Sequence, residues 1–163
     1  GTVFAISPNA AWVSPGGSAE YIAPDISQGA AFSGGVYTLD YVTSFDLTGF
    51  NPSSVLINGL WSTDNSGVDI FVNGHSTGMT SPSFTSLTSF ALSGGSGFFT
   101  SGANELDFRW SNAGGPGGLA VIFSLATADP ASQGVPEPAS LFLLGAGLAT
   151  LAVAGQRYRS RQR

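Results

Sequence analysis

The chain contains no cysteine and no lysine, and it has one histidine and one methionine among its 163 residues. The absence of cysteine excludes disulfide bonds, thiol nucleophiles and cysteine-ligated metals, and it fits an exported bacterial protein that avoids oxidative pairing. Charged residues make up only 9% of the chain, against about 25% in a typical soluble domain. Polarity comes instead from Ser, Thr and Asn, and this composition, together with 23 glycines, is typical of short strands joined by many turns.

The few charges are divided by position. Residues 1–134 hold nine acidic residues and one base, Arg109, which gives a net charge of −8. Residues 135–163 hold Glu137 and four arginines, which gives +3. Proteins that bind nucleic acid draw their affinity from basic contacts to phosphate. An acidic segment without lysine therefore excludes nucleic acid as an expected partner.

The last 29 residues carry three features in a fixed order. They are an extended motif of Val135, Pro136, Glu137 and Pro138, an uncharged run over 139–155, and a basic end over 156–163 with Arg157, Arg159, Arg161 and Arg163. A helix of 17 residues would reach about 26 Å, close to the shortest span that crosses a bilayer. Arginines beside such a span mark its cytoplasmic side. The alternative is a buried helix of a soluble domain, which usually carries a polar face that this run lacks.

This tail resembles the PEP-CTERM sorting signal of exported Gram-negative proteins. The resemblance implies that an exosortase, a membrane enzyme, processes the chain near its Pro-Glu-Pro motif. It also implies a signal peptide that is already removed and an association with exopolysaccharide. Tails of this kind are also classed as an ice-binding-protein C-terminal domain, a label that describes the tail alone. We expect a single-pass inner-membrane precursor that contacts membrane lipid, has its C-terminus in the cytoplasm, and later reaches the cell surface or extracellular matrix.

Residues 1–127 are predicted to form an exported all-β domain, an antiparallel β-sandwich or jelly roll, with 128–134 as a linker and 135–163 as the sorting signal with one transmembrane helix. Apolar and polar residues alternate with period two in "VYTLDYVTSFDL" and "NELDFRW". "GVDIFVNGHSTG" alternates Val68, Ile70 and Val72 against Asp69 and Asn73, and then turns at Asn73-Gly74. "LAVIFSLATA" looks like a strand that is covered on both faces.

Residues 36–127 also resemble a galactose-binding-like β-sandwich, through "NGLWSTDNSGVDIFVNG" and "GANELDFRWSNAGGPGGLAVIF". The resemblance implies glycan binding and, in some members, a structural calcium ion. Candidate sugar-binding residues are Asn58, Asp69 and Asn73. Asp69 and Asn73 are expected to point away from the core, so their substitution should change stability little. Trp61 and Trp110 share faces with aliphatic residues and are expected in the core.

Two further constellations suggest chemistry. Asp64, Asn65 and Asp69 place hard oxygen ligands near one turn and are candidates for a calcium site, although turn formation alone explains such residues. Glu105 and Asp107 lie two apart on one strand face, about 7 Å from each other, within the carboxylate separation of inverting glycosidases. The alternative is a solvated outer face whose negative charge Arg109 partly offsets. His75 lacks partners for catalysis. We therefore assign no catalytic residue and expect no cofactor besides the candidate calcium, and a glycoside hydrolase is the rival interpretation.

Overall fold

The computed structural model describes residues 2–26 and 36–132, which fold into antiparallel β-sheets with no α-helix in this part of the chain. All of them except Ser132 belong to one compact unit, Gly1–Ala131. The strands and 3-10 helices are β1 (Phe4–Ile6), β2 (Tyr21–Ala23), β3 (Tyr37–Asp46), η2 (Pro52–Ser54), β4 (Leu56–Asp64), β5 (Ser66–Val72), β6 (His75–Ser76), β7 (Thr88–Ser93), η3 (Gly94–Ser96), β8 (Ala103–Asn112) and β9 (Gly118–Thr127). The prediction of an all-β antiparallel fold is confirmed.

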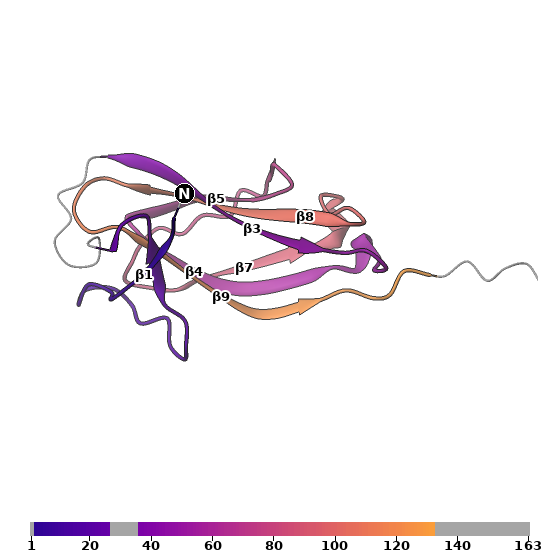
Figure 1. Ribbon diagram of the computed structural model, residues 1–163, viewed down its shortest axis with the longest axis horizontal. Helices are drawn as coiled ribbons and strands as arrows, with labels where there is room; N and C mark the ends of the chain where they lie inside the picture. The colour runs from indigo at the N-terminus through magenta and orange to yellow at the C-terminus, as the bar shows by residue number, and fades with distance from the viewer. Residues whose placement is uncertain (1, 27–35, 133–163) are drawn as a thin grey trace, which may run out of the picture. The chain divides into compact units, whose positions relative to one another are not determined.

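The strands form two sheets that pack face to face. The first sheet has the order β1-β2-β9-β4-β7, and the second has the order β3-β8-β5-β6. Figure 1 shows β3, β5 and β8 in one layer and β4, β7 and β9 in the other. Strands β3 and β8 pair over ten residues without a shift in register, from Tyr37 opposite Asn112 to Asp46 opposite Ala103. This long regular pair forms the backbone of the second sheet.

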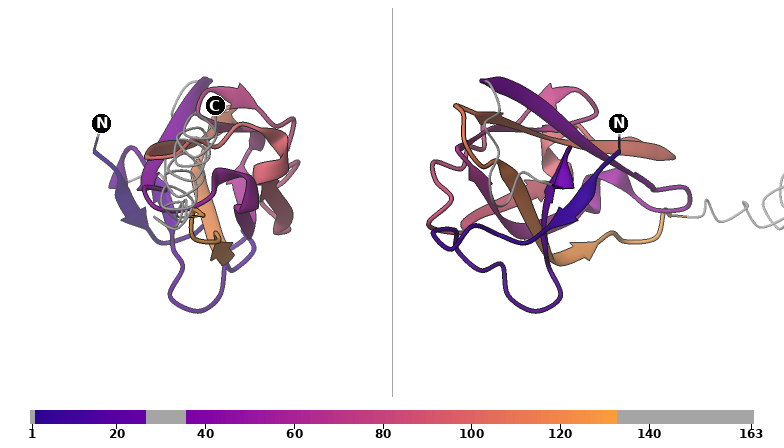
Figure 2. Two further views of the ribbon diagram at one scale, coloured as in Figure 1. Left: turned by 90° about the vertical axis from the view of Figure 1, so that its right-hand side faces the viewer. Right: turned by 60° about the vertical axis from the view of Figure 1, so that its left-hand side comes forward.

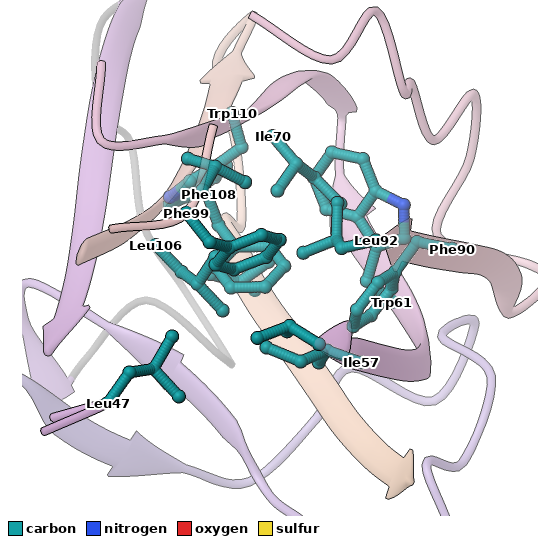
Figure 3. Packing of buried hydrophobic residues seen from close by; sticks show 13 residues of the cluster. Leu47, Ile57, Trp61, Ile70, Phe90, Leu92, Phe99, Leu106, Phe108 and Trp110 are labelled. Atoms are coloured by element: carbon teal, nitrogen blue, oxygen red, sulfur yellow. The ribbon is translucent and has the colours of Figure 1, made fainter. Parts of the chain in front are cut away.

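The core lies between the sheets, on the faces that the period-two pattern predicts. Inward residues of β8 are Leu106, Phe108 and Trp110, and those of β5 are Ile70 and Val72. They meet buried side chains of the first sheet, which include Ile57, Trp61, Phe90 and Leu92 (Figure 3). The expectation that Trp61 and Trp110 are core residues is confirmed, because both side chains are 0% exposed. Burying a large apolar side chain stabilises the fold by about 1.5–3 kcal/mol.

Trp61 joins the two sheets at a point where one of them has no side chain. A Cβ atom added to Gly67 of β5 would lie 2.3 Å from Cη2 of the Trp61 indole. The ring therefore occupies the space that any other residue at position 67 would need. The Trp61 ring also contacts the Phe108 ring, whose centre lies 5.9 Å away in an edge-on arrangement. Close approach of an indole to a bare backbone thus sets the spacing of the sheets at this point.

The alternating pattern predicted that Val68 shares a face with Ile70 and Val72, and this prediction is wrong. The pairing of β5 with β8 shifts between Gly67 and Asp69, so Val68 is an extra residue with no partner in the ladder. Such a β-bulge turns the extra side chain off the expected face. Val68 is accordingly 42% exposed, whereas Ile70 and Val72 beyond the bulge are buried.

The expectation that β9 is covered on both faces is also wrong for most of its length. Leu119 and Ala120 are buried, but the side chains from Phe123 to Thr127 are exposed. Strand β2 pairs with β9 only at Ile22 opposite Leu119. Beyond that point β9 pairs with β4 on one side only, among the described residues. The later part of β9 therefore behaves as an edge strand.

A second, smaller core lies beneath the N-terminal strands. Trp12 packs on Tyr21 with ring centres 4.7 Å apart, and Ile6, Ala23 and Ala120 complete the cluster. The left view of Figure 2 shows this indigo N-terminal segment at the side of the two layers. The indole nitrogen of Trp12 donates a hydrogen bond of 2.7 Å to Asp64 at the end of β4. The bond satisfies a buried donor and ties the N-terminal segment to the first sheet.

The chain remains bonded to the sandwich after β9 ends. The Asn51 amide donates to the Asp129 carbonyl, and the Ala131 amide donates to the Gly49 carbonyl, each at 2.8 Å. The Asp129 amide donates to the Ser54 hydroxyl, also at 2.8 Å. The described contacts therefore continue to Ala131, while the division into residues 1–127, 128–134 and 135–163 stays a prediction.

Replacing Gly67 by alanine should destabilise the fold by about 1–3 kcal/mol, because the new Cβ overlaps a buried, rigid indole. Chemical denaturation followed by circular dichroism would measure the loss. Gly95→Ala is the matched control, since a Cβ at that position meets only the Ser93 hydroxyl, at 3.5 Å. Equal stability of the two variants would contradict the role given to the Trp61–Gly67 contact.

Candidate functional site

Charged side chains gather on the outer face of the β3-β8-β5-β6 sheet. Strand pairing sets Arg109 of β8 between Asp40 of β3 and Asp69 of β5. The guanidinium holds Asp40 at two points, with Nε–Oδ1 at 2.7 Å and Nη2–Oδ2 at 3.1 Å. The Arg109 Cζ also lies 4.6 Å from the centre of the Phe71 ring, a cation–π contact. Arg109 thus neutralises one acid and leaves the face acidic.

Glu105 and Asp107 point to this same outer face, as the alternation of β8 predicts. Asp107 is half-buried between Val42 and Phe71 of the neighbouring strands, and Glu105 is exposed. Burial, and after it the negative charge of Asp40, raises the pKa of Asp107 to about 6, while Arg109 opposes the rise. The pair belongs to one open strand face. Catalytic carboxylates of glycosidases instead flank the scissile bond.

The three candidate calcium ligands bond separately to the protein. Asp64 accepts the Trp12 indole hydrogen, and Asn65 accepts the Ala113 amide at 2.6 Å. Asp64 ends a strand of the first sheet, whereas Asp69 belongs to the second sheet. Burial raises the pKa of Asp64, and the Trp12 bond partly offsets the rise. Across residues 2–26 and 36–132, no group of three or more His, Cys, Asp or Glu side chains is arranged to hold a metal, so a calcium site stays a prediction.

The candidate sugar-binding residues also lie in different places. Asn58 is in β4 of the first sheet, Asp69 is in β5 of the second sheet, and Asn73 begins the turn after β5. Asp69 points away from the core as predicted, but it is covered by β6. Its carboxylate accepts hydrogen bonds from the Ser76 hydroxyl and from the Ile70 amide, the latter at 2.8 Å. These contacts argue against the expectation that substitution of Asp69 leaves stability unchanged.

Asn73 holds two loops together. Asn73 has a φ of 50° and Gly74 a φ of 79°, the left-handed values of a two-residue hairpin turn, so the predicted turn is confirmed. The Asn73 side chain donates to the Phe98 carbonyl and to Asn104 Oδ1, each at 2.8 Å. Its own oxygen accepts the Glu105 amide at 2.8 Å. Because all these bonds are structural, the expectation that Asn73 is dispensable for stability does not fit the structure.

The Asn73 contacts place an aromatic pair beside a hollow. His75, just after the turn, stacks on Phe98 with ring centres 4.9 Å apart and planes 10° from parallel. The adjoining hollow is about 320 Å³ in volume and is lined by Val72, Ser76, Thr77, Met79, Ala91, Leu92, Ser93, Ser96, Phe98 and Phe99. It combines aromatic and apolar surface with four hydroxyl groups and no charge. Such surfaces suit a neutral, hydroxyl-rich ligand.

The hollow was not predicted from the sequence. Its residues come from β5, β6, the segment after β6, β7, η3 and the loop after η3, and no single segment shows them as a group. Phe98 lies in a loop outside any alternating pattern. The adjacent aromatics Phe98 and Phe99, in a loop rich in glycine and serine, were the one available signal.

A larger apolar groove opens between the edges of the two sheets. It measures about 530 Å³, and its lining includes Phe45, Leu47, Ile57, Leu106 and Phe123. Figure 3 shows Leu47 set apart from Leu106 and Ile57, and all three residues line the groove. The groove lies where β3 and the later part of β9 leave the sandwich open.

Comparison with family models finds the PEP-CTERM protein-sorting motif, matched by residues 134–159. The chain carries a PEP-CTERM sorting signal. This confirms the resemblance of the tail and indicates an exported protein with exosortase as its processing partner. No curated protein and no solved structure matches the chain. The galactose-binding-like resemblance of residues 36–127 therefore stays a prediction.

The residues of the PEP-CTERM signal lie outside the described part of the structure. This applies to the Val135–Pro138 motif, to the predicted transmembrane helix over 139–155 and to the four arginines of 156–163. Among the residues that are described, no helix has the length and hydropathy needed to span a bilayer.

Asp107→Asn should raise the thermal stability of the domain at pH 7 and flatten its dependence on pH. A carboxyl with pKa about 6 in the folded state and about 3.9 in the unfolded state binds its proton more tightly when folded. Its contribution is complete below about pH 4 and is lost as the pH rises through 6. Melting temperatures from pH 3.5 to 7.5 would show this. Asp129→Asn, which removes an exposed acid, is the control, and parallel curves for both variants would contradict the assignment.

Proposed function

We propose that this protein is a non-catalytic component of the cell surface or extracellular matrix that an exosortase sorts and that binds a neutral glycan. The PEP-CTERM signal supports export and sorting. The hollow beside His75 and Phe98 carries the binding proposal, because it pairs an aromatic surface with hydroxyl groups. Asn73 contributes by holding Phe98 in place, rather than by contacting sugar as the sequence suggested.

Charge favours a neutral ligand. Residues 1–134 have a net charge of −8 and contain no lysine, so the domain repels sulfated or phosphate-rich polymers. The hollow itself has no charged lining residue. We expect dissociation constants of about 0.1–1 mM for single sugars, because few contacts are buried. Many copies on one matrix would supply useful retention.

We also propose that the precursor has the membrane topology that the tail suggests. Residues 139–155 cross the inner membrane in contact with lipid, and Arg157, Arg159, Arg161 and Arg163 stay on the cytoplasmic side. The exosortase then acts near Val135–Pro138 on the outer side. Asp64, Asn65 and Asp69 hold no calcium in this proposal, since each side chain bonds to the protein itself.

The rival function is glycoside hydrolysis by Glu105 and Asp107. The pKa of Asp107 at about 6 favours it, because a general acid works best near the ambient pH. Against it stands the open strand face that carries both carboxylates. Neither residue lines the hollow or the groove. We therefore prefer the binding function.

Replacing Pro136, Glu137 and Pro138 together by alanine should leave a larger, unprocessed precursor in the membrane of a host that contains the exosortase. The stiff, extended Pro-Glu-Pro strip is the feature that the enzyme would read. Mass spectrometry of the chain's C-terminus would reveal the difference. Replacing Pro24, a proline of the folded unit, by alanine is the control. Processing of the triple variant at the wild-type site would contradict the sorting mechanism.

On a glycan array, wild-type protein should bind neutral glycans, and Phe98→Ala should lower binding at least tenfold because the stacking surface is lost. Phe4→Ala, which removes an exposed ring on β1, is the control and should bind normally. No binding by wild type at high glycan density would remove the lectin-like function. Release of reducing sugar that vanished in Glu105→Gln would establish the glycosidase instead.

A further inference from the structure

The free edge of the second sheet is a regular surface for strand pairing. β3 pairs with β8 on one side, and no other strand of the described residues pairs with it. The Leu47 amide bonds to the Gly102 carbonyl at 2.8 Å, one step beyond the Asp46–Ala103 pair. Because bonding alternates along an antiparallel strand, odd-numbered residues bond to β8 and even-numbered ones direct their amides and carbonyls outward. The outward set is Thr38, Asp40, Val42, Ser44 and Asp46.

Apart from the charges of Asp40 and Asp46, this edge lacks the features that keep sheets from joining. Exposed edge strands are usually short, bulged, or guarded by lysine or proline. β3 is ten residues long, pairs with β8 without a bulge, and contains neither lysine, arginine nor proline. All five outward residues are exposed, and Val42 at their centre is 53% exposed.

We propose that β3 pairs antiparallel with β3 of a second copy of this chain, in a register centred on Val42, to join two sandwiches into one continuous sheet. A two-fold axis at Val42 sets it opposite its own copy. Asp40 then faces Ser44, and Asp46 faces Thr38. No acid faces an acid, and all five outward residues find backbone partners. Centring on Asp40 instead would set that acid opposite itself.

The charge of the domain is compatible with this register. Two copies with net charge −8 in residues 1–134 repel each other, so contact requires a surface where acids do not meet. Asp40 is already paired with Arg109, which lowers its repulsion. The Val42 side chains meet across the axis, and an apolar pair in a hydrogen-bonded position adds to the contact. Joining through β3 is independent of the glycan hollow, which lies at β5, β6 and β7.

A single cysteine tests the axis, because the chain contains no other thiol. Cα atoms of a hydrogen-bonded antiparallel pair lie about 5.5 Å apart, which a disulfide can bridge. The full chain carrying Val42→Cys, in mild detergent under gentle oxidation, should form a covalent dimer. Val68→Cys is the control, since Val68 is similarly exposed but lies on β5, between β6 and β8. It should form at least fivefold less dimer.

A charge exchange tests the register in chains that keep Val42. In Ser44→Asp, the new acid of each copy faces Asp40 of the other copy, so two acid–acid pairs form. The dimer should be at least fivefold weaker, as measured by sedimentation velocity in detergent. Ser44→Lys should preserve or strengthen it. Salt at 1 M should narrow the difference, because screening then acts within about 3 Å. Circular dichroism melts check that all variants fold.

The pairing through β3 would be overturned by equal cross-linking at positions 42 and 68, which indicates random collision or association through the tail alone. It would also be overturned by a monomeric wild-type chain, or by Ser44→Asp and Ser44→Lys chains that associate equally. The pairing is supported by preferential cross-linking at position 42 together with dimerisation that is weakened in Ser44→Asp but not in Ser44→Lys.

Discussion

The spacing of the two sheets depends on the contact between the Trp61 indole and the bare backbone of Gly67. It works only because β5 offers no side chain there, and because the bulge that follows turns Val68 outward. Past the bulge, Ile70 and Val72 face the core again. The register in which β5 pairs with β8 beyond the bulge sets the alternation of the two strands. The burial of Leu106 and Phe108 and the position of the Asn73 turn follow from it.

The Asn73 turn connects the fold to the candidate site. Asn73 bonds to the Phe98 carbonyl, to Asn104 and to the Glu105 amide, so the loop after η3 is held against the hairpin. Buried Asn104 extends this network to the Thr100 carbonyl at 2.7 Å. Phe98 therefore reaches His75 without belonging to any strand. The polar network thus places Phe98 at the hollow, whereas Phe99, its other aromatic lining residue, belongs to the apolar core.

The sequence predicted the strands whose pattern is regular over many residues. β3 and β8 alternate cleanly, and their inward and outward residues lie as expected. Prediction failed where one residue breaks the period, as at Val68, and where burial depends on neighbours, as in β9 past Leu119. Strands β1 and β2 are too short to show a period. The sorting signal was predictable because its three features are contiguous, whereas the hollow draws residues from several segments that are separate in the sequence. Asp69 and Asn73 were assigned to sugar because their bonds to Ser76 and Phe98 leave no trace in the sequence.

The bonds that fix Ala131 to Gly49 and Asp129 to Asn51 also determine how the domain would carry load. A chain held by its C-terminal end transmits tension first to these two contacts and then to β9. That strand is bonded along its length to β4, so a pull along the direction of β9 loads many hydrogen bonds together rather than one after another. A domain that is tethered at this end therefore resists unravelling, because the hydrogen bonds between β9 and β4 are loaded in shear.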